Sequence, residues 1–330
     1  MNRTELISII NADKPFDFED TALQLFKYQY KYNAVYRKWV DDIKCEVDNV
    51  RSVREIPFLP ISAFKSFKLH CELTNEQLVF LSSGTTGLMP SRHFVFDLDL
   101  YLKTTQLIFE SLYGKLKDLC FLALLPSYLE RSGSSLVQMV DHFITQSQYP
   151  QSGFYLYDHF ELKNKLLECK EKNIPTVLFG VSFALLDFIS ENSISFPELI
   201  IIETGGMKGR KKEITRENLH NQIANGFGVI NVHSEYGMTE LFSQAYSKHE
   251  GIFYPGNTMS VLIKDISDPL NLVKDGKTGI INIIDLANVD SCAFIETQDL
   301  GKRYDDGSFE VLGRLDVSDI RGCNLMVSDL

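Results

Sequence analysis

The first 75 residues combine a helical pattern of apolar positions with a segment bounded by prolines. Leu23, Phe26 and Tyr30 recur at near-helical spacing, which predicts a helix over about 20–43. Two prolines in the sequence IPFLPISAFKSFKL, which follows, rule out a regular helix there. Residues 1–75 are therefore expected to form a helical lead-in.

Short apolar runs alternate with amphipathic stretches over residues 76–254. The runs that predict buried strands are QLVFL, CFLALL, TVLFG and LIIIE. The stretches that predict helices are 97–114, 134–147, 160–172 and 181–192. This alternation indicates an α/β core with a parallel sheet flanked by helices, and ligands are expected at the carboxyl ends of its strands.

The pattern changes again over residues 255–330. Short strand-like pieces, SVLIK, GIINIID and SFEVLG, are separated by turn residues. The dipeptide Asp306-Gly307 is a hairpin signal. We expect a small β-rich subdomain that ends in a short C-terminal tail.

Composition excludes several classes of protein. Among 330 residues, 33 Lys and Arg face 44 Asp and Glu, a net charge of −11, which disfavours nucleic acid and anionic membranes as partners. No apolar run is long enough to span a bilayer, and no signal peptide is evident, so a cytoplasmic location is expected. The six cysteines make no C-x-x-C pair, which argues against a disulfide framework or a zinc site.

The strongest local motif is the sequence SSGTTG at 82–87, directly after an apolar run. Its glycines let the backbone curl so that N–H groups surround phosphate oxygens, and its hydroxyls can contact a magnesium ion. Arg92 and His93 follow and could add positive charge. A polar turn between a strand and a helix remains the alternative.

Two further motifs have both a structural and a functional interpretation. Tyr236-Gly237-Met238-Thr239-Glu240 supplies a ring that could stack on a base and a carboxylate that could bind magnesium, but it also fits a capped helix start. The sequences TQDLG at 297–301 and GRLD at 313–316 could bind ribose and phosphate, or they could form two Asp- and Gly-rich hairpin turns.

A fourth motif suggests a different class of enzyme. Gly180-Val181-Ser182-Phe183-Ala184 approaches the G-x-S-x-G nucleophile elbow, with His233 or His249 as candidate bases. A helix that begins at a capping serine explains the same residues. An acyl hydrolase that uses Ser182 is therefore one alternative function.

Taken in order, SSGTTG, Gly205-Gly206, YGMTE, TQDLG and GRLD resemble the acyl-adenylate-forming (ANL) superfamily over about 80–322. Within it, the lead-in IPFLPISAFKSFKL, the SSGTTG…SRH loop and the closing IRGCNLM resemble the acyl-protein synthetases of the LuxE type; phenylacetate–CoA ligases are more distant. The resemblance implies the ANL-type α/β large domain, with the mobile C-terminal domain largely absent.

The resemblance also implies roles for individual residues. The phosphate loop is Ser82, Ser83, Gly84, Thr85, Thr86 and Gly87. Gly205 and Gly206 would line the adenine pocket, Tyr236 would stack on the base, and Glu240 would hold Mg²⁺. The nucleotide site would further include Gly237, Met238, Thr239, Asp299 at the ribose, Arg314 nearby, and Asp316 at the hinge.

The chain departs from the superfamily pattern in two ways. Ser91 and Arg92 stand where the phosphate loop is usually followed by a lysine, and few residues follow the hinge, so the usual catalytic lysine is expected to be missing. Arg92 and Lys208 are the candidates for stabilising the developing charge. Cys323, 7 residues before the last residue, Leu330, is the candidate acyl acceptor, and Arg321 would favour its thiolate.

The expected function is that of an ATP- and Mg²⁺-dependent, AMP-forming ligase. It would activate a carboxylic acid, with a fatty acid as first candidate, as an acyl-adenylate. It would then form a thioester on Cys323 for an acyl reductase or acyltransferase partner. A non-catalytic protein that binds nucleotide or acyl groups is the remaining alternative.

Overall fold

The computed structural model describes the chain except at residues 13 and 74 and in the ranges 83–88, 126–132, 206–213, 269–270 and 316–330. The chain divides into two compact units. Unit 1 comprises Met1–Thr105, Gly237–Gln244 and Tyr254–Leu330, and unit 2 comprises Gln106–Tyr236 and Ala245–Phe253.

Unit 1 begins with three helices, each capped by a polar side chain that accepts a backbone N–H bond: Asn2, Asp17 and Asn33. The helices are α1 (Arg3–Ile10), α2 (Phe18–Tyr32) and α3 (Ala34–Asp42). Two 3₁₀ turns, a two-residue strand and a short helix follow: η1 (Val47–Asn49), η2 (Val53–Glu55), β1 (Leu59–Pro60) and α4 (Ala63–Ser66). The helical lead-in expected from the apolar pattern is thus present, and its proline-bounded segment contains only these short elements.

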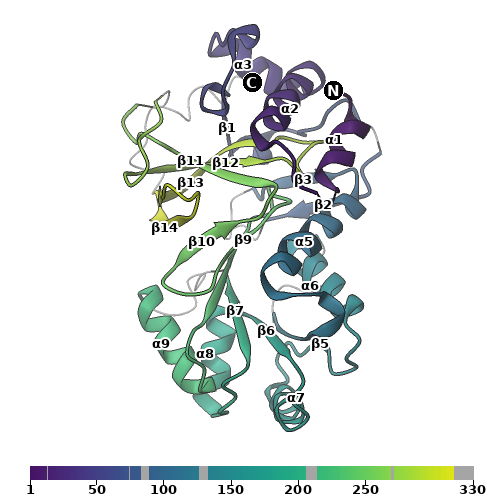
Figure 1. Cartoon of the computed structure of the whole chain (residues 1–330), viewed down its shortest axis with the longest axis vertical. Coiled ribbons are helices and arrows are strands. Elements are labelled where there is room, and N and C mark those ends of the chain that lie inside the picture. Colours follow the sequence, from purple (N-terminus) through teal and green to yellow (C-terminus); the bar gives the residue numbers. More distant parts are fainter. Residues whose placement is uncertain are drawn as a thin grey trace. The chain divides into compact units, whose positions relative to one another are not determined.

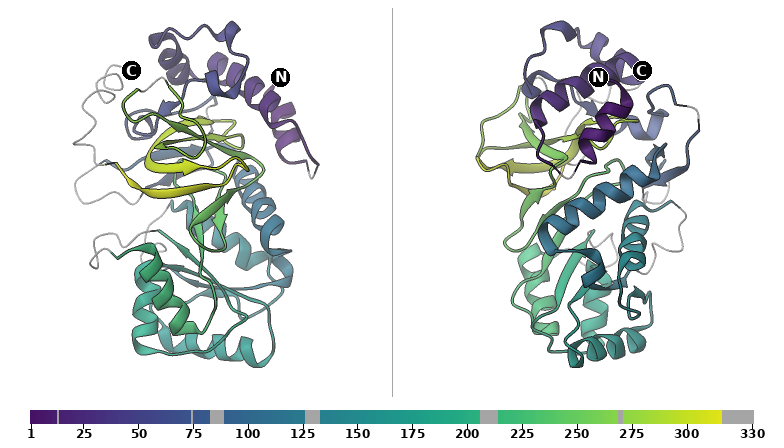
Figure 2. Two further views of the ribbon diagram at one scale, coloured as in Figure 1. Left: turned by 60° about the vertical axis from the view of Figure 1, so that its left-hand side comes forward. Right: turned by 45° about the vertical axis from the view of Figure 1, so that its right-hand side comes forward.

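The main sheet of unit 1 is antiparallel and is built from the C-terminal strands. In order, these are β11 (Met259–Lys264), β12 (Thr278–Asp285), β13 (Phe294–Arg303) and β14 (Phe309–Arg314), with β1 running parallel to β13. Asp306-Gly307 forms the expected hairpin turn between β13 and β14, and Gly307 adopts a φ of 85° there. Figure 2 shows α1–α3 beside this sheet.

The apolar run QLVFL was expected to join the parallel sheet, and this prediction is wrong. Its strand β2 (Leu78–Leu81) pairs antiparallel with β3 (Arg92–Val95) in a separate two-stranded sheet of unit 1. Only one of its four residues is buried, whereas all five of β4 (Cys120–Leu124) are buried. An apolar run predicts a strand but does not identify the strand's partner.

Unit 2 holds the parallel sheet that the sequence predicts. Strands β4, β6 (Thr176–Val181), β7 (Ile200–Thr204) and β8 (His233–Tyr236) lie parallel and adjacent. Next to them, β5 (Gly153–Phe154) runs parallel to β4, and β9 (Ala245–Ser247) runs antiparallel to β8. The remaining strand is β10 (Ile252–Pro255), which carries the chain from unit 2 back into unit 1.

The helices connecting these strands are α5 (Leu98–Tyr113), which starts in unit 1, η3 (Leu116–Asp118), α6 (Ser135–Gln146), α7 (His159–Glu171), α8 (Ser182–Glu191) and α9 (Arg216–Phe227). Four of them, α5 to α8, begin and end within two residues of the predicted stretches, whereas η3 and α9 were not predicted. Figure 1 shows α8 and α9 side by side along β6 and β7. No helix within the described ranges has both the length and the apolar character that a bilayer span requires.

The two units differ from the three consecutive segments expected at 1–75, 76–254 and 255–330. The lead-in and the C-terminal strands belong to one unit because they share an aromatic core. The ring of Phe294 on β13 lies 6.1 Å from Phe26, 5.9 Å from Tyr36 and 6.3 Å from Phe58 between ring centroids. The lead-in therefore completes the core that supports the antiparallel sheet.

Candidate functional site

In unit 1, the hairpin of β2 and β3 holds the two ends of the candidate phosphate loop. Ser82 and Ser91 face each other across its base: Ser91 N–H donates to Ser82 Oγ at 2.8 Å, and Ser82 N–H donates to Ser91 O at 3.1 Å. The motif residues between them lie outside the described residues; these are Ser83, Gly84, Thr85, Thr86 and Gly87. The described ends of the loop, Ser82 and Ser91, are therefore held together by the hairpin.

Glu240 is close to this hairpin although about 150 residues separate them in the sequence. The residue is 6% exposed, and the hydroxyl of Ser91 hydrogen-bonds to its carboxylate. Burial raises the pKa of Glu240, while Ser91 and the positive charges of Arg314 and Lys65 act in the opposite direction. A carboxylate with little access to water can be stabilised by a metal ion that replaces the lost solvation.

Arg92 carries a positive charge next to the base of the loop, directly after Ser91 in the sequence. It lies on β3 opposite Leu81, and its guanidinium carbon is 5.8 Å from the centroid of the Phe94 ring. Its buried Nε atom has no hydrogen-bond partner among the described residues. A buried donor of this kind fits an anionic ligand, because leaving it unpaired is costly.

His93 does not supply the positive charge that the sequence suggested. The side chain is 1% exposed, and burial lowers its pKa from 6.5 to about 4, so the imidazole is neutral at pH 7. Its Nδ1 lies 2.9 Å from the carbonyl of Thr239 and therefore carries the proton, and Nε2 accepts from Ser291 Oγ at 2.8 Å. His93 fixes the segment that carries Glu240.

Asp299 and Arg314 are neighbours in the antiparallel sheet of unit 1. They are directly paired on β13 and β14, and the guanidinium of Arg314 donates to Gln298 Oε1 at 3.2 Å. The alternative that TQDLG forms a turn is wrong, because these residues lie inside β13. Arg314 ends β14, and Asp316 of the GRLD motif lies outside the described residues.

In unit 2, Gly205 follows β7 with a φ of 70°, a left-handed conformation that favours glycine. Ser182 Oγ lies 2.6 Å from the carbonyl oxygen of Gly205 and 2.8 Å from Glu203 Oε2. Tyr236 is buried, and its ring centroid lies 5.8 Å from that of Phe253. The second glycine, Gly206, and Lys208 lie outside the described residues.

These contacts indicate that the hydroxyl of Ser182 has a structural role. Its hydroxyl is buried against Glu203 and Gly205, so it is held by structural contacts. The expected capping role is wrong, because Val181 is the N-cap of α8 and Ser182 is its first helical residue. His233 instead lies 3.0 Å from the hydroxyl of Tyr113, and burial lowers its pKa to about 4. The other candidate base, His249, is exposed beside Glu250.

Sequence reasoning missed a buried acidic group at the carboxyl ends of β7 and β8. Glu203 accepts from Ser234 Oγ at 3.0 Å, with His220 at 3.6 Å, while Thr204 donates to Glu235 on the other face of the sheet. Burial, with a smaller contribution from the charge of Glu203, raises the pKa of Glu235 to about 7, although the hydrogen bond from Thr204 lowers it in part. The available signal was a glutamate at the end of LIIIE and another directly before YGMTE.

The described candidate residues therefore form a separate group in each unit. Unit 1 brings together Ser82, Ser91, Glu240 and Arg314, and unit 2 presents Gly205 and Tyr236. Within the described ranges, no group of three or more His, Cys, Asp and Glu side chains could hold a metal ion. Cys323 lies outside the described residues. A single buried carboxylate fits a magnesium ion that is held mainly by nucleotide phosphates.

Comparison with known proteins identifies relatives of the chain. The family model described as acyl-protein synthetase, LuxE, matches residues 137–330, more than half of the sequence. The long-chain-fatty-acid–luciferin-component ligase of Aliivibrio fischeri is 24% identical over 344 residues, covering 93% of this chain and 86% of that protein. The ligase of the same name from Photorhabdus luminescens is 37% identical over 68 residues, or 20% of this chain and 58% of that protein.

Solved structures support the fold. An open conformation of 2-hydroxyisobutyryl-CoA ligase in complex with 2-HIB-AMP and CoA gives a TM-score of 0.67 at 11% identity, covering 93% of this chain and 81% of that one. ATP-bound MatB from Rhodopseudomonas palustris gives 0.53 at 17% identity over 74% of this chain, which spans about half (49%) of MatB. These comparisons confirm three predictions: the resemblance to the acyl-protein synthetases, the α/β fold of the adenylate-forming enzymes, and the assignment of the chain as a ligase.

Proposed function

Because the chain belongs to the LuxE acyl-protein synthetase family, we propose that it activates a carboxylic acid with ATP and passes the acyl group to a thiol. The acid proposed first is a long-chain fatty acid, since the curated relatives are named for that substrate. ATP use is supported by the adenylate-forming neighbours, one of which is described with ATP bound.

The observation that carries the proposal is the buried carboxylate of Glu240 beside the base of the Ser/Thr/Gly loop. In the proposed reaction, a carboxylate oxygen of the acid forms a bond to the α-phosphorus of ATP, and pyrophosphate leaves with the bonding electron pair. Loop N–H groups and Arg92 would bind phosphate oxygens, and Lys208 would add charge. Mg²⁺ held by Glu240 would neutralise charge on the phosphates.

The nucleoside would be held by the other motifs. Gly205 and Gly206 would line the adenine pocket, and the ring of Tyr236 would stack on the base; Gly237, Met238 and Thr239 follow Tyr236 in the sequence. The carboxylate of Asp299 can accept hydrogen bonds from both ribose hydroxyls, and Arg314 is directly across the strand pair. These interactions would orient the α-phosphate for attack.

The second half-reaction is proposed to take place at Cys323. The thiolate would attack the acyl carbonyl of the adenylate, a C–S bond would form, and AMP would leave with the C–O bonding pair. The resulting thioester would be passed to a reductase or acyltransferase, and the reaction would take place in the cytoplasm.

The test measures the two half-reactions separately. Magnesium-ATP and a panel of carboxylic acids are incubated with the full chain, pyrophosphate exchange into ATP is followed, and intact mass is recorded before and after hydroxylamine. We expect acid-dependent exchange and an acyl-sized, hydroxylamine-labile mass on the peptide that holds Cys323. Cys323→Ser should keep exchange and lose the adduct, while Cys45→Ser, at the least buried described cysteine, should keep both.

Glu240→Gln tests the metal site. Loss of the charge should reduce exchange by about 10²-fold, since about 3 kcal/mol of charge stabilisation is removed. Glu76→Gln, an exposed carboxylate of the same unit, should leave exchange unchanged. Full exchange in Glu240→Gln would refute the metal role, and nucleotide binding without exchange in the wild type would identify a non-catalytic binding protein.

A further inference from the structure

The segment that carries Glu240 is held by side chains from elsewhere in unit 1. Its consecutive peptide groups, from 239 to 243, bond to partners distant in the sequence. The carbonyl of Thr239 accepts from His93 at 2.9 Å, and the carbonyl of Glu240 accepts from Asn288 Nδ2 at 2.8 Å. Two carbonyls that flank the Glu240 Cα are thus fixed from two directions.

Asp285 holds the second half of the same segment. Its Oδ2 accepts from the N–H groups of Phe242 at 2.7 Å and Ser243 at 3.0 Å, and its Oδ1 accepts from Ser243 Oγ at 2.6 Å. The side chain is completely buried, and Ala287 N–H donates to Oδ1 at 3.1 Å. A buried carboxylate that accepts four hydrogen bonds is a rigid support, because each lost bond leaves a buried group unpaired.

Asp285 and Asn288 belong to one short stretch of chain. Asp285 ends β12, and Asn288 lies in the β12–β13 loop, residues 286–293. Asn288 is 1% exposed, and its Oδ1 has no partner among the described residues, so the contact with Glu240 is made by its Nδ2 donor. The end of β12 and this loop therefore act together with His93 to fix the backbone around Glu240.

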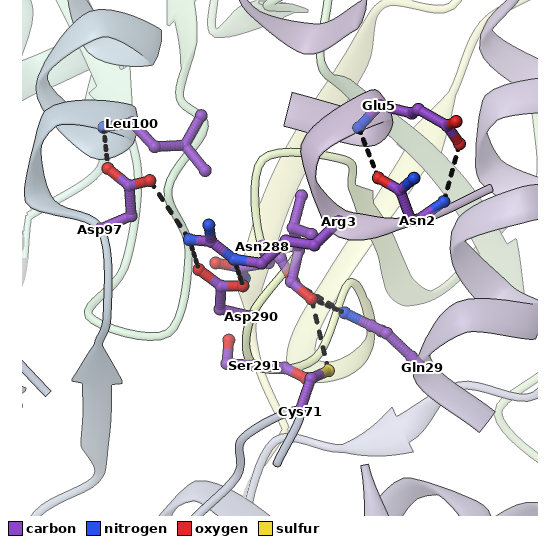
Figure 3. A network of polar contacts seen from close by, with 11 residues as sticks. Asn2, Arg3, Glu5, Gln29, Cys71, Asp97, Leu100, Asn288, Asp290 and Ser291 are labelled. Atoms are coloured by element: carbon purple, nitrogen blue, oxygen red, sulfur yellow. Dashed lines mark hydrogen bonds and ion pairs between the residues drawn. The ribbon is translucent and has the colours of Figure 1, made fainter. Parts of the chain in front are cut away.

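The β12–β13 loop is in turn anchored to the N-terminal helices (Figure 3). The guanidinium of Arg3 on α1 donates to both oxygens of Asp290, at 2.6 and 2.7 Å. The side chain of Gln29 on α2 donates to the carbonyl of Asn288 at 2.7 Å and accepts from Ala293 N–H at 2.9 Å. Bidentate contacts restrict orientation as well as distance.

We propose that Asn288 and Asp285 are positioning residues for the metal-binding carboxylate of Glu240, and that the N-terminal helices support them through Arg3 and Gln29. The proposal rests on the proposed function, in which Glu240 binds magnesium together with ATP. The carboxylate of Glu240 must reach the ion at a fixed distance, and a shift of its backbone would weaken that contact.

The test compares two isosteric substitutions on the wild-type background. Asn288→Asp keeps the shape of the side chain but removes the donor to Glu240. Asn282→Asp is the matched control: Asn282 is 2% exposed, lies on β12 and also has an Oδ1 atom without a partner in the described structure. Pyrophosphate exchange gives kcat, the KM for magnesium-ATP and the KM for the acid.

We expect Asn288→Asp to raise the KM for magnesium-ATP at least fivefold with an unchanged KM for the acid, whereas Asn282→Asp leaves both KM values unchanged. Arg3→Gln, at the outer end of the network, should give a smaller shift in the same direction, and it keeps the test decisive if Asn288→Asp fails to fold. If the wild type is active, the positioning role alone is refuted by either of two results. The first is an unshifted KM for magnesium-ATP in a folded Asn288→Asp variant, and the second is an equal shift in the Asn282→Asp control. If Asn288→Asp does not fold, an unshifted KM in Arg3→Gln refutes it. A wild type without exchange would refute the proposed function, and the positioning role with it.

Discussion

The carboxyl group of Glu235 provides the sharpest test of the electrostatics of unit 2. Burial is the largest cause of its raised pKa, from 4.5 to about 7, and the hydrogen bond from Thr204 lowers it in part. In Glu235→Gln the amide oxygen can still accept that bond, so the substitution removes the charge and preserves the contact. We expect the variant to be more stable than the wild type above neutral pH.

The magnitude follows from the two pKa values. The carboxyl group has a pKa of about 7 in the folded state and 4.5 in the unfolded state, so the folded protein binds the proton more tightly. The free energy of unfolding therefore falls as the pH rises between these two values. The cost of ionisation is about 0.8 kcal/mol at pH 5 and about 3.4 kcal/mol at pH 8. Glu235 as a whole is half-buried, so these figures are upper values.

The assay is urea-induced unfolding followed by circular dichroism at pH 5 and pH 8. The advantage of Glu235→Gln over the wild type should grow by up to about 2.5 kcal/mol between the two pH values. Glu198→Gln, at an exposed position of unit 2, should show no such growth. An equal stability difference at both pH values would show that the carboxyl of Glu235 is solvated in the folded state, contrary to its environment in this structure.

Three further predictions concern unit 1. Burial lowers the pKa of His93 to about 4, so the free energy of unfolding should be about 2.5 kcal/mol lower at pH 4.5 than at pH 7. His93→Gln should reduce this acid sensitivity in urea unfolding. Phe294→Ala should destabilise the unit by about 3–5 kcal/mol, as a buried ring with three aromatic neighbours is removed, and the fluorescence of the buried Trp39 should report it. Ser82→Ala removes the acceptor for Ser91 N–H and should raise the KM for magnesium-ATP about fivefold, corresponding to about 1 kcal/mol, with little change in unfolding midpoint.

Helices were predicted more accurately than strand pairing because their periodicity is local. The stretch 134–147 became α6 (Ser135–Gln146), whereas the run QLVFL gave a strand but not its antiparallel partner β3. The sequence TQDLG looked like a turn because Asp and Gly are common in turns. In β13, however, a Cβ on Gly301 would lie 2.4 Å from the carbonyl oxygen of Glu310, so this glycine permits a close approach of two strands.

The motifs named candidate residues but could not give their environment. The order of motifs selected Glu240 and Arg314, and in the structure Ser91 bonds to the Glu240 carboxylate while the charge of Arg314 acts on it. The sequence could not reveal that His93 is buried and neutral, because a histidine beside an arginine looks like a second cation until its neighbours are known. The support from Asp285 was also hidden, since an isolated aspartate at a strand end carries no local signal.

The division of unit 1 into separated pieces of chain has a consequence during protein synthesis. Gln29 bonds to the carbonyl of Asn288, which is added 259 residues later. At about 5–20 residues per second, this partner is added roughly 13–50 s after α2 has been synthesised. All of unit 2 is synthesised during that interval. The apolar face of α2, with Leu25 and Phe26, would be exposed during that interval and would be a natural substrate for chaperones. Translation that stalls before β13 would leave the nascent N-terminal helices without the strand they pack against.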